Sequence, residues 1–105
     1  MEPFEIFITY LLWGSGGKKR PILVYALSCG NVRAYKITTQ YENKNEQIKT
    51  VYFKIADWSK AGLDKLSYVD TGTPISFPLS VLNGKEPIGK LSAQDEIKLL
   101  KFLSK

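Results

Sequence analysis

A glycine-rich segment followed by three consecutive cations concentrates groups that can hold an anion. Gly14, Gly16 and Gly17 let the backbone take positive φ and let a ligand come close to the main chain. The triplet Lys18–Arg20 follows at once, so the segment predicts a loop in which free N–H groups and positive charge lie together. The guanidinium of Arg20 is a permanently charged planar fork that matches two phosphate oxygens at once.

The residues after the basic triplet predict a β-hairpin that places a threonine beside Arg20. Pro21 suits the first residue of a strand, and Ile22–Leu27 is apolar without alternation, as in a strand buried on both faces. Cys29–Asn31 supplies a short loop, and the second strand ends at Thr38. Because a hairpin brings its outer ends together, we expect Arg20 and Thr38 to be near neighbours. On the residues alone, a surface arginine and an ordinary strand threonine remain the plainer explanation of the pair.

Positive charge is concentrated on the predicted hairpin and the strand after it. The 105 residues have a net charge of +5, and residues 18–54 carry eight Lys or Arg against two glutamates. This distribution favours an anionic partner such as nucleic acid, with a solvated basic surface as the alternative. The 44% hydrophobic and 24% charged residues predict one folded domain over residues 1–105.

Cysteine and histidine usage excludes several kinds of chemistry. Cys29 is the single cysteine, so an internal disulfide is excluded, which fits a reducing cytosol. The chain has no histidine, which excludes imidazole catalysis and zinc binding by His/Cys clusters. The apolar N-terminal stretch is short and carries early glutamates, so we expect neither a signal peptide nor a membrane span.

The rest of the chain is typical of short strands separated by turns. Strands are predicted at Phe4–Trp13, Thr50–Ile55, Leu66–Thr71, Ile75–Phe77 and Pro87–Leu91. Loops or turns are predicted at 40–47, 72–74 and 79–84. Trp58 lies in a predicted helical turn between Asp57 and Gly62, where it is expected to fill the core rather than stack on a base.

One amphipathic helix is predicted at the C-terminal end. Ser92 and Asp95 resemble a capping box at its start. Apolar residues then recur at three- and four-residue spacing, so one face should pack on the sheet; they are Ile97, Leu99, Leu100 and Leu103. The order of elements indicates a mainly β fold, a small twisted barrel or sandwich with one terminal helix.

Four segments, in order along nearly the whole chain, resemble the PemK/MazF family of toxin endoribonucleases. They are Gly16–Leu23, Ile37–Gln40, the stretch from Asp57 to Val69, and Ile88–Ser92 leading into the helix. The resemblance implies a fold similar to an SH3-like β-barrel with a C-terminal amphipathic helix. It also implies a cytoplasmic homodimer whose partner is an antitoxin with an acidic, partly disordered tail that blocks a basic groove.

The resemblance further implies an enzyme that cleaves single-stranded RNA, such as mRNA, without a metal or other cofactor. In such enzymes the ribose 2′-OH attacks the adjacent phosphate and leaves a 2′,3′-cyclic phosphate and a 5′-hydroxyl. It implies catalytic roles for Arg20 and Thr38. The residues that would contact RNA phosphates are Gly16, Gly17, Lys18, Lys19, Thr39, Gln40 and, where a solvated strand face is the alternative role, Arg33 and Lys36.

The sequence departs from the family at the position of an acid or base. Some members carry an Arg-x-Asp pair where this chain has Asp70-Thr71-Gly72, without an arginine. Asp70 and Ser67 are the candidates for a base or positioning group, although an aspartate before Thr-Gly is typical of turns. The alternative is therefore a non-catalytic barrel that binds nucleic acid or an acidic protein segment. In either case the aromatic residues near the hairpin could stack on bases; they are Tyr25, Tyr35 and Tyr41.

Overall fold

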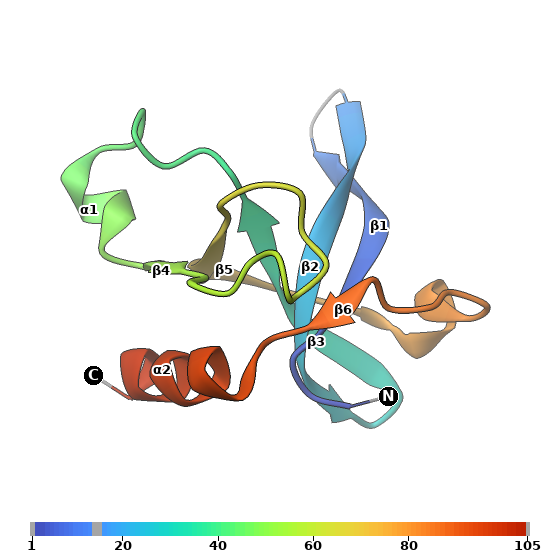
Figure 1. Ribbon diagram of the computed structural model, residues 1–105. Coiled ribbons are helices and arrows are strands. Elements are labelled where there is room, and N and C mark those ends of the chain that lie inside the picture. The colour runs from blue at the N-terminus through green and yellow to red at the C-terminus, as the bar shows by residue number, and fades with distance from the viewer. Residues whose placement is uncertain (1, 14–15, 105) are drawn as a thin grey trace.

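The fold is a six-stranded antiparallel sheet that curls into a half-barrel, with a helix at the C-terminal end (Figure 1). The computed structural model describes residues 2–13 and 16–104. The strands are β1 (Glu5–Trp13), β2 (Gly16–Ser28), β3 (Asn31–Thr38), β4 (Tyr52–Lys54), β5 (Tyr68–Pro78) and β6 (Gly89–Lys90), in the order β4-β5-β3-β2-β1-β6. The helical elements are α1 (Glu46–Lys49), the 3₁₀ turn η1 (Leu79–Leu82) and α2 (Ala93–Leu103). The expected mainly β fold with a C-terminal helix is confirmed.

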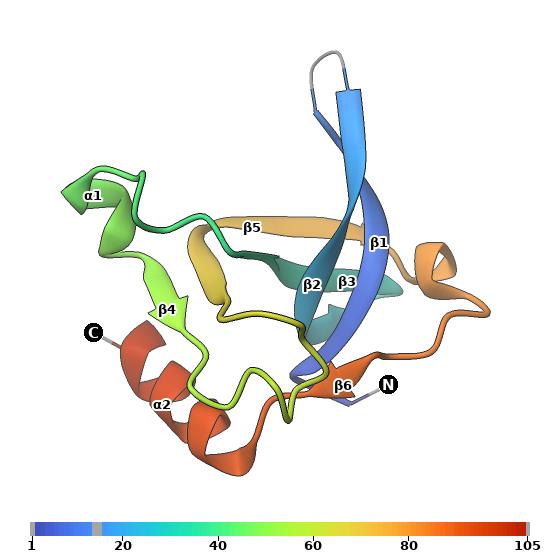
Figure 2. The ribbon, with the colours of Figure 1, turned by 45° about the horizontal axis from the view of Figure 1, so that its top comes forward.

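The predicted glycine loop is wrong for Gly16 and Gly17, which belong to β2. This strand pairs with β1 residue by residue from Leu23 back to Gly16, so the basic triplet also lies in a strand. The ladder supplies the backbone hydrogen bonds that a loop would leave open, and this gain outweighs the weak strand preference of glycine. Figure 2 shows the resulting long β1–β2 hairpin standing out from the sheet. Gly14 lies outside the described residues.

Pro21 is inside β2 rather than at its first residue. It pairs with Ile8 of β1, whereas the β2–β3 ladder extends only from Ser28 back to Ile22. The position therefore lies just beyond the last β3 pair, where a missing N–H breaks no bond to that neighbour.

The predicted β2–β3 hairpin is confirmed, and its turn is tight. Ser28 pairs with Asn31, so only Cys29 and Gly30 lie between the strands. Both take positive φ, 53° and 79° respectively. Two central residues with positive φ match the right-handed twist of the flanking strands. Cys29 adopts this conformation in spite of its side chain and is exposed.

The turn predicted at residues 72–74 interrupts the pairing of a strand without ending it. β5 continues from Tyr68 to Pro78, but its register against β3 jumps from Lys36↔Asp70 to Ala34↔Ile75. The turn-forming residues between Asp70 and Ile75 bulge out of the ladder, and β5 bends there (Figure 2). The 3₁₀ turn η1 likewise lies in the segment predicted as a turn at 79–84, whereas α1 begins within the predicted loop at 40–47.

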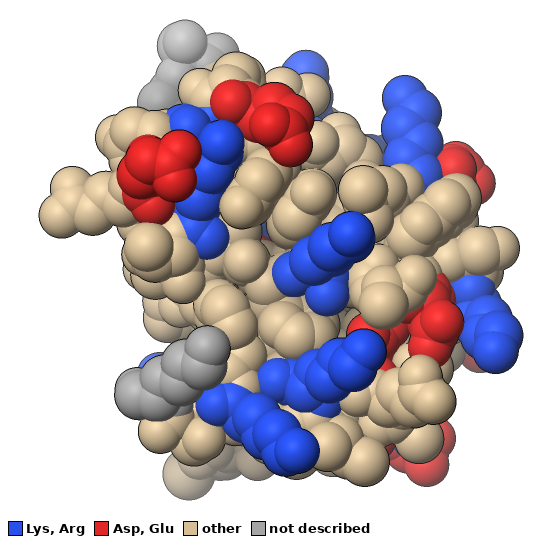
Figure 3. Space-filling view, turned by 60° about the vertical axis from the view of Figure 1, so that its left-hand side comes forward, with Lys and Arg blue, Asp and Glu red and all other residues tan. Residues whose placement is uncertain are grey.

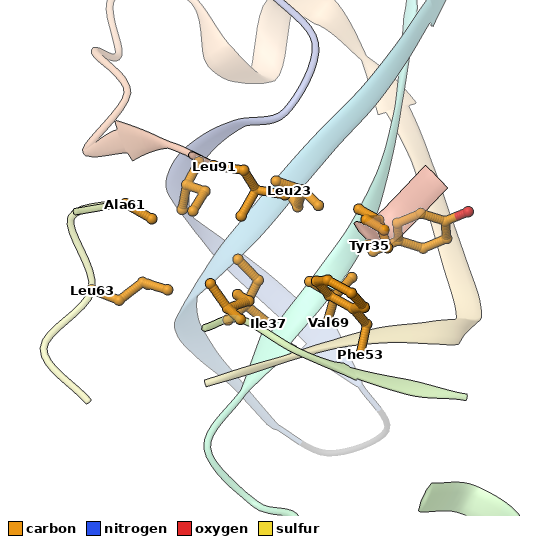
Figure 4. Packing of buried hydrophobic residues seen from close by; sticks show 11 residues of the cluster. Leu23, Tyr35, Ile37, Phe53, Ala61, Leu63, Val69 and Leu91 are labelled. Atoms are coloured by element: carbon orange, nitrogen blue, oxygen red, sulfur yellow. The ribbon is translucent and has the colours of Figure 1, made fainter. Parts of the chain in front are cut away.

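Two hydrophobic clusters lie on opposite faces of the sheet because successive strand residues point to opposite sides. The main core lies between one face and the segments from Ile55 to Leu63 and from Leu91 to Phe102 (Figure 4). Trp58 packs against it, as the sequence predicts. The smaller core lies on the other face and consists of Phe7, Ile22, Val24, Val32, Ala34 and Leu82.

Helix α2 begins at the predicted cap but buries a different face. The Ser92 hydroxyl accepts from the Asp95 N–H at 3.2 Å, as expected. Leu99 is fully buried and Phe102 packs beside it, whereas Ile97 and Leu100 are 56% and 54% exposed. The expected apolar face was therefore wrong for most of its members, because Asp95, at 0% exposure, turns inward together with Leu99.

The buried carboxylate of Asp95 joins α2 to the segment after β4. It accepts from the backbone N–H of Ala56 at 3.2 Å and of Asp57 at 2.8 Å. The Asp57 carboxylate in turn accepts from the Ser92 hydroxyl at 2.7 Å. These bonds fix the start of α2 against the main core.

We expect Asp95→Ala to destabilise the protein, because it leaves two partly buried backbone N–H groups without their acceptor. Each unsatisfied group costs about 1–3 kcal/mol. Since 1 kcal/mol shifts Tm by about 4–8 °C in a domain of this size, thermal unfolding should show a fall of at least that amount. Glu86→Ala, on an exposed loop, is the matched control and should leave Tm unchanged. An Asp95→Ala variant as stable as the wild type would contradict this role.

Candidate functional site

Arg20 and Thr38 line the same hollow, which confirms that they are near neighbours. The other residues of this hollow are Lys36, Ile37, Tyr52 and Asp70, and its volume is about 160 Å³. Pockets that enclose whole small molecules are typically about 300–1,000 Å³. The hollow, which we call the arginine pocket, therefore suits one group of an extended ligand, such as a phosphate, better than a complete small molecule.

Strand register explains why these residues meet. Lys36 of β3 is paired with Ile22 of β2 and with Asp70 of β5, and Asp70 is paired with Tyr52 of β4. Paired residues of an antiparallel sheet share a face, so these side chains form one row across the strands. Two residues further along β3, Thr38 is paired with Tyr68. Thr38 and Tyr68 thus begin a second row, and Arg20, which lies two residues before Ile22 in β2, belongs to it.

The arginine pocket lies on the same face as the smaller core. Ile22 and Val24 of β2 and Ala34 of β3 belong to that core, while Arg20 and Lys36 continue the same alternation toward the other end of their strands. One face of the sheet thus changes from buried apolar residues to polar pocket residues. The main core and α2 lie on the opposite face of the sheet.

The two groups proposed for chemistry differ in how they are held. Within residues 2–13 and 16–104, the Arg20 guanidinium has no hydrogen bond or ion pair, although it is half-buried. The Thr38 hydroxyl accepts from the Gln40 N–H at 3.0 Å. Since a hydroxyl also carries one donor, Thr38 keeps its own O–H for a ligand. The pocket therefore offers a free cation beside an oriented hydroxyl.

Asp70 has a structural role that the sequence also suggested. Its carboxylate accepts from the Gly72 N–H at 3.0 Å and from the Thr73 hydroxyl at 2.8 Å, which holds the bulge in β5. It nevertheless lines the arginine pocket. Each carboxylate oxygen has two lone pairs, so Asp70 retains acceptor capacity while it holds the bulge.

Tyr52 is the pocket residue that the sequence reasoning missed. Alternation along the predicted strand at 50–55 puts Tyr52 on the face away from the buried Phe53 and Ile55. That signal gives the face but not the neighbours, because the Tyr52↔Asp70 pair joins residues distant in the sequence. Burial, and next the nearby Asp70 carboxylate, raise the pKa of Tyr52 above the ordinary value of 10.0. Its phenol therefore stays protonated at neutral pH.

Several predicted site residues lie outside the arginine pocket. Ser67 is 3% exposed and donates its hydroxyl to the Lys65 carbonyl at 2.9 Å. It lines a separate hollow of about 230 Å³ together with Thr39 and Pro21. Gln40 contacts the pocket residue Thr38 through its backbone N–H. Its side-chain oxygen accepts a hydrogen bond from the Asn43 side chain at 3.3 Å.

The predicted phosphate-contacting residues of the hairpin are divided between the faces of the sheet. Alternation puts Lys18 on the face of Arg20 and Lys19 on the other, where Lys19 is paired with Tyr10. Gly16 and Gly17 pair with the tip of β1, beyond the pocket residues. Arg33 is exposed near the opposite end of β3, where it is paired with Ala26 and Ser76. Of the hairpin cations, the arginine pocket thus gathers Arg20 and Lys36.

The tyrosines considered for base stacking also separate into two groups. Tyr25 and Tyr35 stack on each other at 4.3 Å and pack with the main core. Tyr41 instead stacks on Tyr68 at 4.3 Å and approaches Tyr52 of the arginine pocket. Only the second group adjoins the pocket.

Charge on the surface near α1, β4 and α2 is mostly positive. Figure 3 views the molecule from that side and shows Lys and Arg side chains through the centre and lower part, with acidic side chains toward the margins. In the arginine pocket itself, two cations face one carboxylate. The described part of the chain contains no group of three His, Cys, Asp or Glu side chains that could hold a metal ion. It also contains no helix long and apolar enough to cross a membrane.

The curled antiparallel sheet with its C-terminal helix is a MazF-like toxin fold, as the sequence resemblance predicts. A solved structure with this fold is the Mycobacterium tuberculosis toxin MazF-mt6. The two are similar with a TM-score of 0.68 over 95% of this chain and 92% of that chain, at 22% sequence identity. No protein-family model matches the sequence, and no curated protein matches it. The likeness is thus carried by the fold.

We expect the stability of the protein to fall at alkaline pH. Burial is the first cause that raises the pKa of Tyr35, Tyr52 and Tyr68 above 10.0. In the unfolded chain these phenols ionise near pH 10, while the folded protein holds their protons to a higher pH. Their contribution is therefore full below about pH 10 and is lost as the pH rises through the folded pKa values.

Urea unfolding at about pH 9 and about pH 11 measures this loss as a fall in the midpoint. Tyr35→Phe removes the phenol of the tyrosine in the main core and should make the fall smaller. A midpoint that stays constant or rises over this range would show that the tyrosines are not held in their protonated form by the fold.

Proposed function

We propose that this protein is a metal-independent endoribonuclease that cleaves single-stranded RNA and acts as the toxin of a toxin–antitoxin pair. The observation that carries the proposal is the arginine pocket, in which a free guanidinium lies beside a threonine hydroxyl on a MazF-like fold. The similar solved protein is named a toxin.

Arg20 would bind the scissile phosphate. When the ribose 2′-oxygen attacks phosphorus, a new P–O bond forms while the bond to the 5′-oxygen breaks, and negative charge grows on the other phosphate oxygens. A planar cation in place before the reaction stabilises this charge without having to reorganise. Lys36, on the same face, would add charge to the pocket.

Thr38 and Asp70 would act on the hydroxyl that attacks. Thr38 can donate its O–H to a phosphate oxygen or orient the 2′-OH, because the bond that it accepts from the Gln40 N–H leaves its O–H and a second lone pair available. Asp70 is the pocket carboxylate that can take the 2′-OH proton. The leaving 5′-oxygen would take a proton from water, so the products would be a 2′,3′-cyclic phosphate and a 5′-hydroxyl.

A second candidate function is favoured by the state of Asp70. Both of its carboxylate oxygens already accept hydrogen bonds within the bulge, so the carboxylate is held in the fold instead of being free to approach a ribose hydroxyl. A protein without an effective base would hold RNA, or an acidic protein segment, in the same pocket without cleaving it.

The partners follow from the positive charge. An antitoxin with an acidic tail would compete with RNA for the basic face, and its attraction would fall with salt. We also propose that the protein acts as a homodimer in the cytoplasm, in keeping with its single cysteine, Cys29.

We expect Arg20→Ala to reduce the cleavage rate of a mixed-sequence single-stranded RNA in EDTA by about 10²–10³. The reason is the loss of the cation that faces the growing phosphate charge. The rate and the cyclic-phosphate ends are measured by gel and mass spectrometry.

Arg33→Ala is the matched control for this experiment, because it removes an arginine from the neighbouring strand outside the pocket. Its rate should equal that of the wild type. If folded wild type binds RNA in a salt-sensitive way but leaves it intact, the binding-only function is correct instead.

We expect Thr38→Val to lower kcat about 5- to 150-fold, since a hydrogen bond worth about 1–3 kcal/mol is lost in the transition state. Thr38→Ser keeps the hydroxyl and should restore most of the activity. The rates are compared after urea unfolding has established that both variants are folded, because valine also removes the acceptor for the Gln40 N–H. Activity that is kept in Thr38→Val but lost in Thr38→Ser would show that the methyl group, not the hydroxyl, is what matters.

A further inference from the structure

Three tyrosines form a cluster at the side of the arginine pocket. Tyr41 and Tyr68 stack with ring centroids 4.3 Å apart and planes 8° apart. Tyr52 lies 6.4 Å from Tyr41, with its ring tilted by 43°. We call Tyr41, Tyr52 and Tyr68 the tyrosine cluster.

The tyrosine cluster is not part of either hydrophobic core. None of its three members belongs to the buried clusters or to the residues packed against them, and all three are half-buried. The cluster therefore places a large aromatic surface where the fold does not need it to fill the interior.

Strand register brings the cluster to the reacting groups. Tyr68 is paired with Thr38, and Tyr52 is paired with Asp70. Tyr52 also lines the arginine pocket directly. A ligand group bound at Arg20 and Thr38 would thus have the Tyr52 ring as its neighbour on the β4 side.

The members of the cluster differ in their contacts. Tyr41 has Tyr68 stacked against it and the Lys49 ammonium 4.9 Å from its ring centroid. These contacts hold the segment around Tyr41 against β5 and fix the Tyr41 and Tyr68 rings in place. Tyr52, tilted away from this stack, is the ring that faces the pocket.

Cations flank the tyrosines on several sides. Arg20 and Lys36 lie in the pocket, Lys49 lies over Tyr41, and the exposed Lys54 is paired with Tyr68. Alternation of cations with aromatic rings is the arrangement that binds single-stranded nucleic acids, where the phosphates meet the charges and the bases stack on the rings.

We propose that Tyr52, supported by Tyr41 and Tyr68, forms a nucleobase subsite that stacks on the base next to the phosphate held by Arg20. This inference rests on the proposed function, because it takes single-stranded RNA as the ligand. It assigns the ring of Tyr52 to recognition of the substrate and leaves the chemistry to the neighbouring residues. Stacking on the ring would tolerate any base and would orient the strand across the pocket.

The test measures binding rather than cleavage, so that it does not depend on turnover. The probes are two fluorescein-labelled strands with every 2′-hydroxyl methylated, which blocks attack. One is a mixed-sequence strand, and the other has the same length and phosphates but abasic sugars throughout. Affinities are measured by fluorescence anisotropy at low salt.

We expect Tyr52→Leu to weaken binding of the base-bearing strand about 5- to 150-fold, as for loss of one base–aromatic stack. Binding of the abasic strand should change by less than about twofold, because a strand without bases has nothing to stack on the Tyr52 ring and so loses nothing when the ring is removed. Tyr52→Phe keeps the ring and should bind both strands like the wild type. Tyr10→Leu, an exposed tyrosine on the opposite face of the sheet, is the matched control and should have no effect.

A second variant separates loss of stacking from loss of folding. Tyr52→Thr keeps a good strand former in β4 and should show the same selective loss, with urea unfolding as the measure of stability. If Tyr52→Leu weakens both strands equally, or if Tyr52→Phe weakens the base-bearing strand as much as leucine does, the stacking subsite is wrong. If the wild type binds neither strand, the proposed RNA ligand fails together with the subsite.

Discussion

The arrangement of β3 between β2 and β5 is the constraint on which the site depends. The pocket residues of β3, β4 and β5 are placed by pairs in the β2–β3, β3–β5 and β4–β5 ladders, and Arg20 lies in β2 two residues before the Ile22↔Lys36 pair. Because strand side chains alternate, a slip of one residue would move Lys36 and Thr38 to the face of the main core and carry Ile37 into the pocket face. The buried side chains of Ile37 and Val69 on one face, and of Ile22 and Ala34 on the other, prevent this slip. The hydrophobic cores thus set the positions of the pocket residues indirectly, through register.

The bulge in β5 shows how the same residue can serve the fold and the site. Asp70 holds the bulge through its bonds to Gly72 and Thr73, and the bulge lets β5 resume pairing at Ile75. Asp70 is thereby fixed at the edge of the arginine pocket. The hydrogen bonds that its oxygens accept fix the position of the carboxylate. A site built on paired strands in this way holds its groups more rigidly than a loop would.

The two faces of the sheet differ in what covers them. The main core and the buried Asp95 join α2 to one face. The other face is apolar at one end and polar at the other, where the arginine pocket and the tyrosine cluster adjoin. The fold is similar to that of MazF-mt6 at 22% sequence identity. Binding of an RNA strand would then depend on side chains such as Tyr52, which lies outside both hydrophobic cores.

The sequence by itself determined the class of fold, the β2–β3 hairpin, the cap of α2 and the proximity of Arg20 to Thr38, because these depend on local patterns and on a tight turn. It did not determine that Gly16–Arg20 would extend β2, since this requires pairing with β1. Nor did it predict that Ile97 and Leu100 would be exposed, because the inward face of α2 is chosen by the bonds of Asp95 to residues about 40 positions earlier. The tertiary structure alone brought Tyr52 to Asp70, separated Ser67 and Arg33 from the pocket, and gathered the tyrosine cluster. Each of these placements depends on contacts between residues far apart in the chain, which no local pattern encodes.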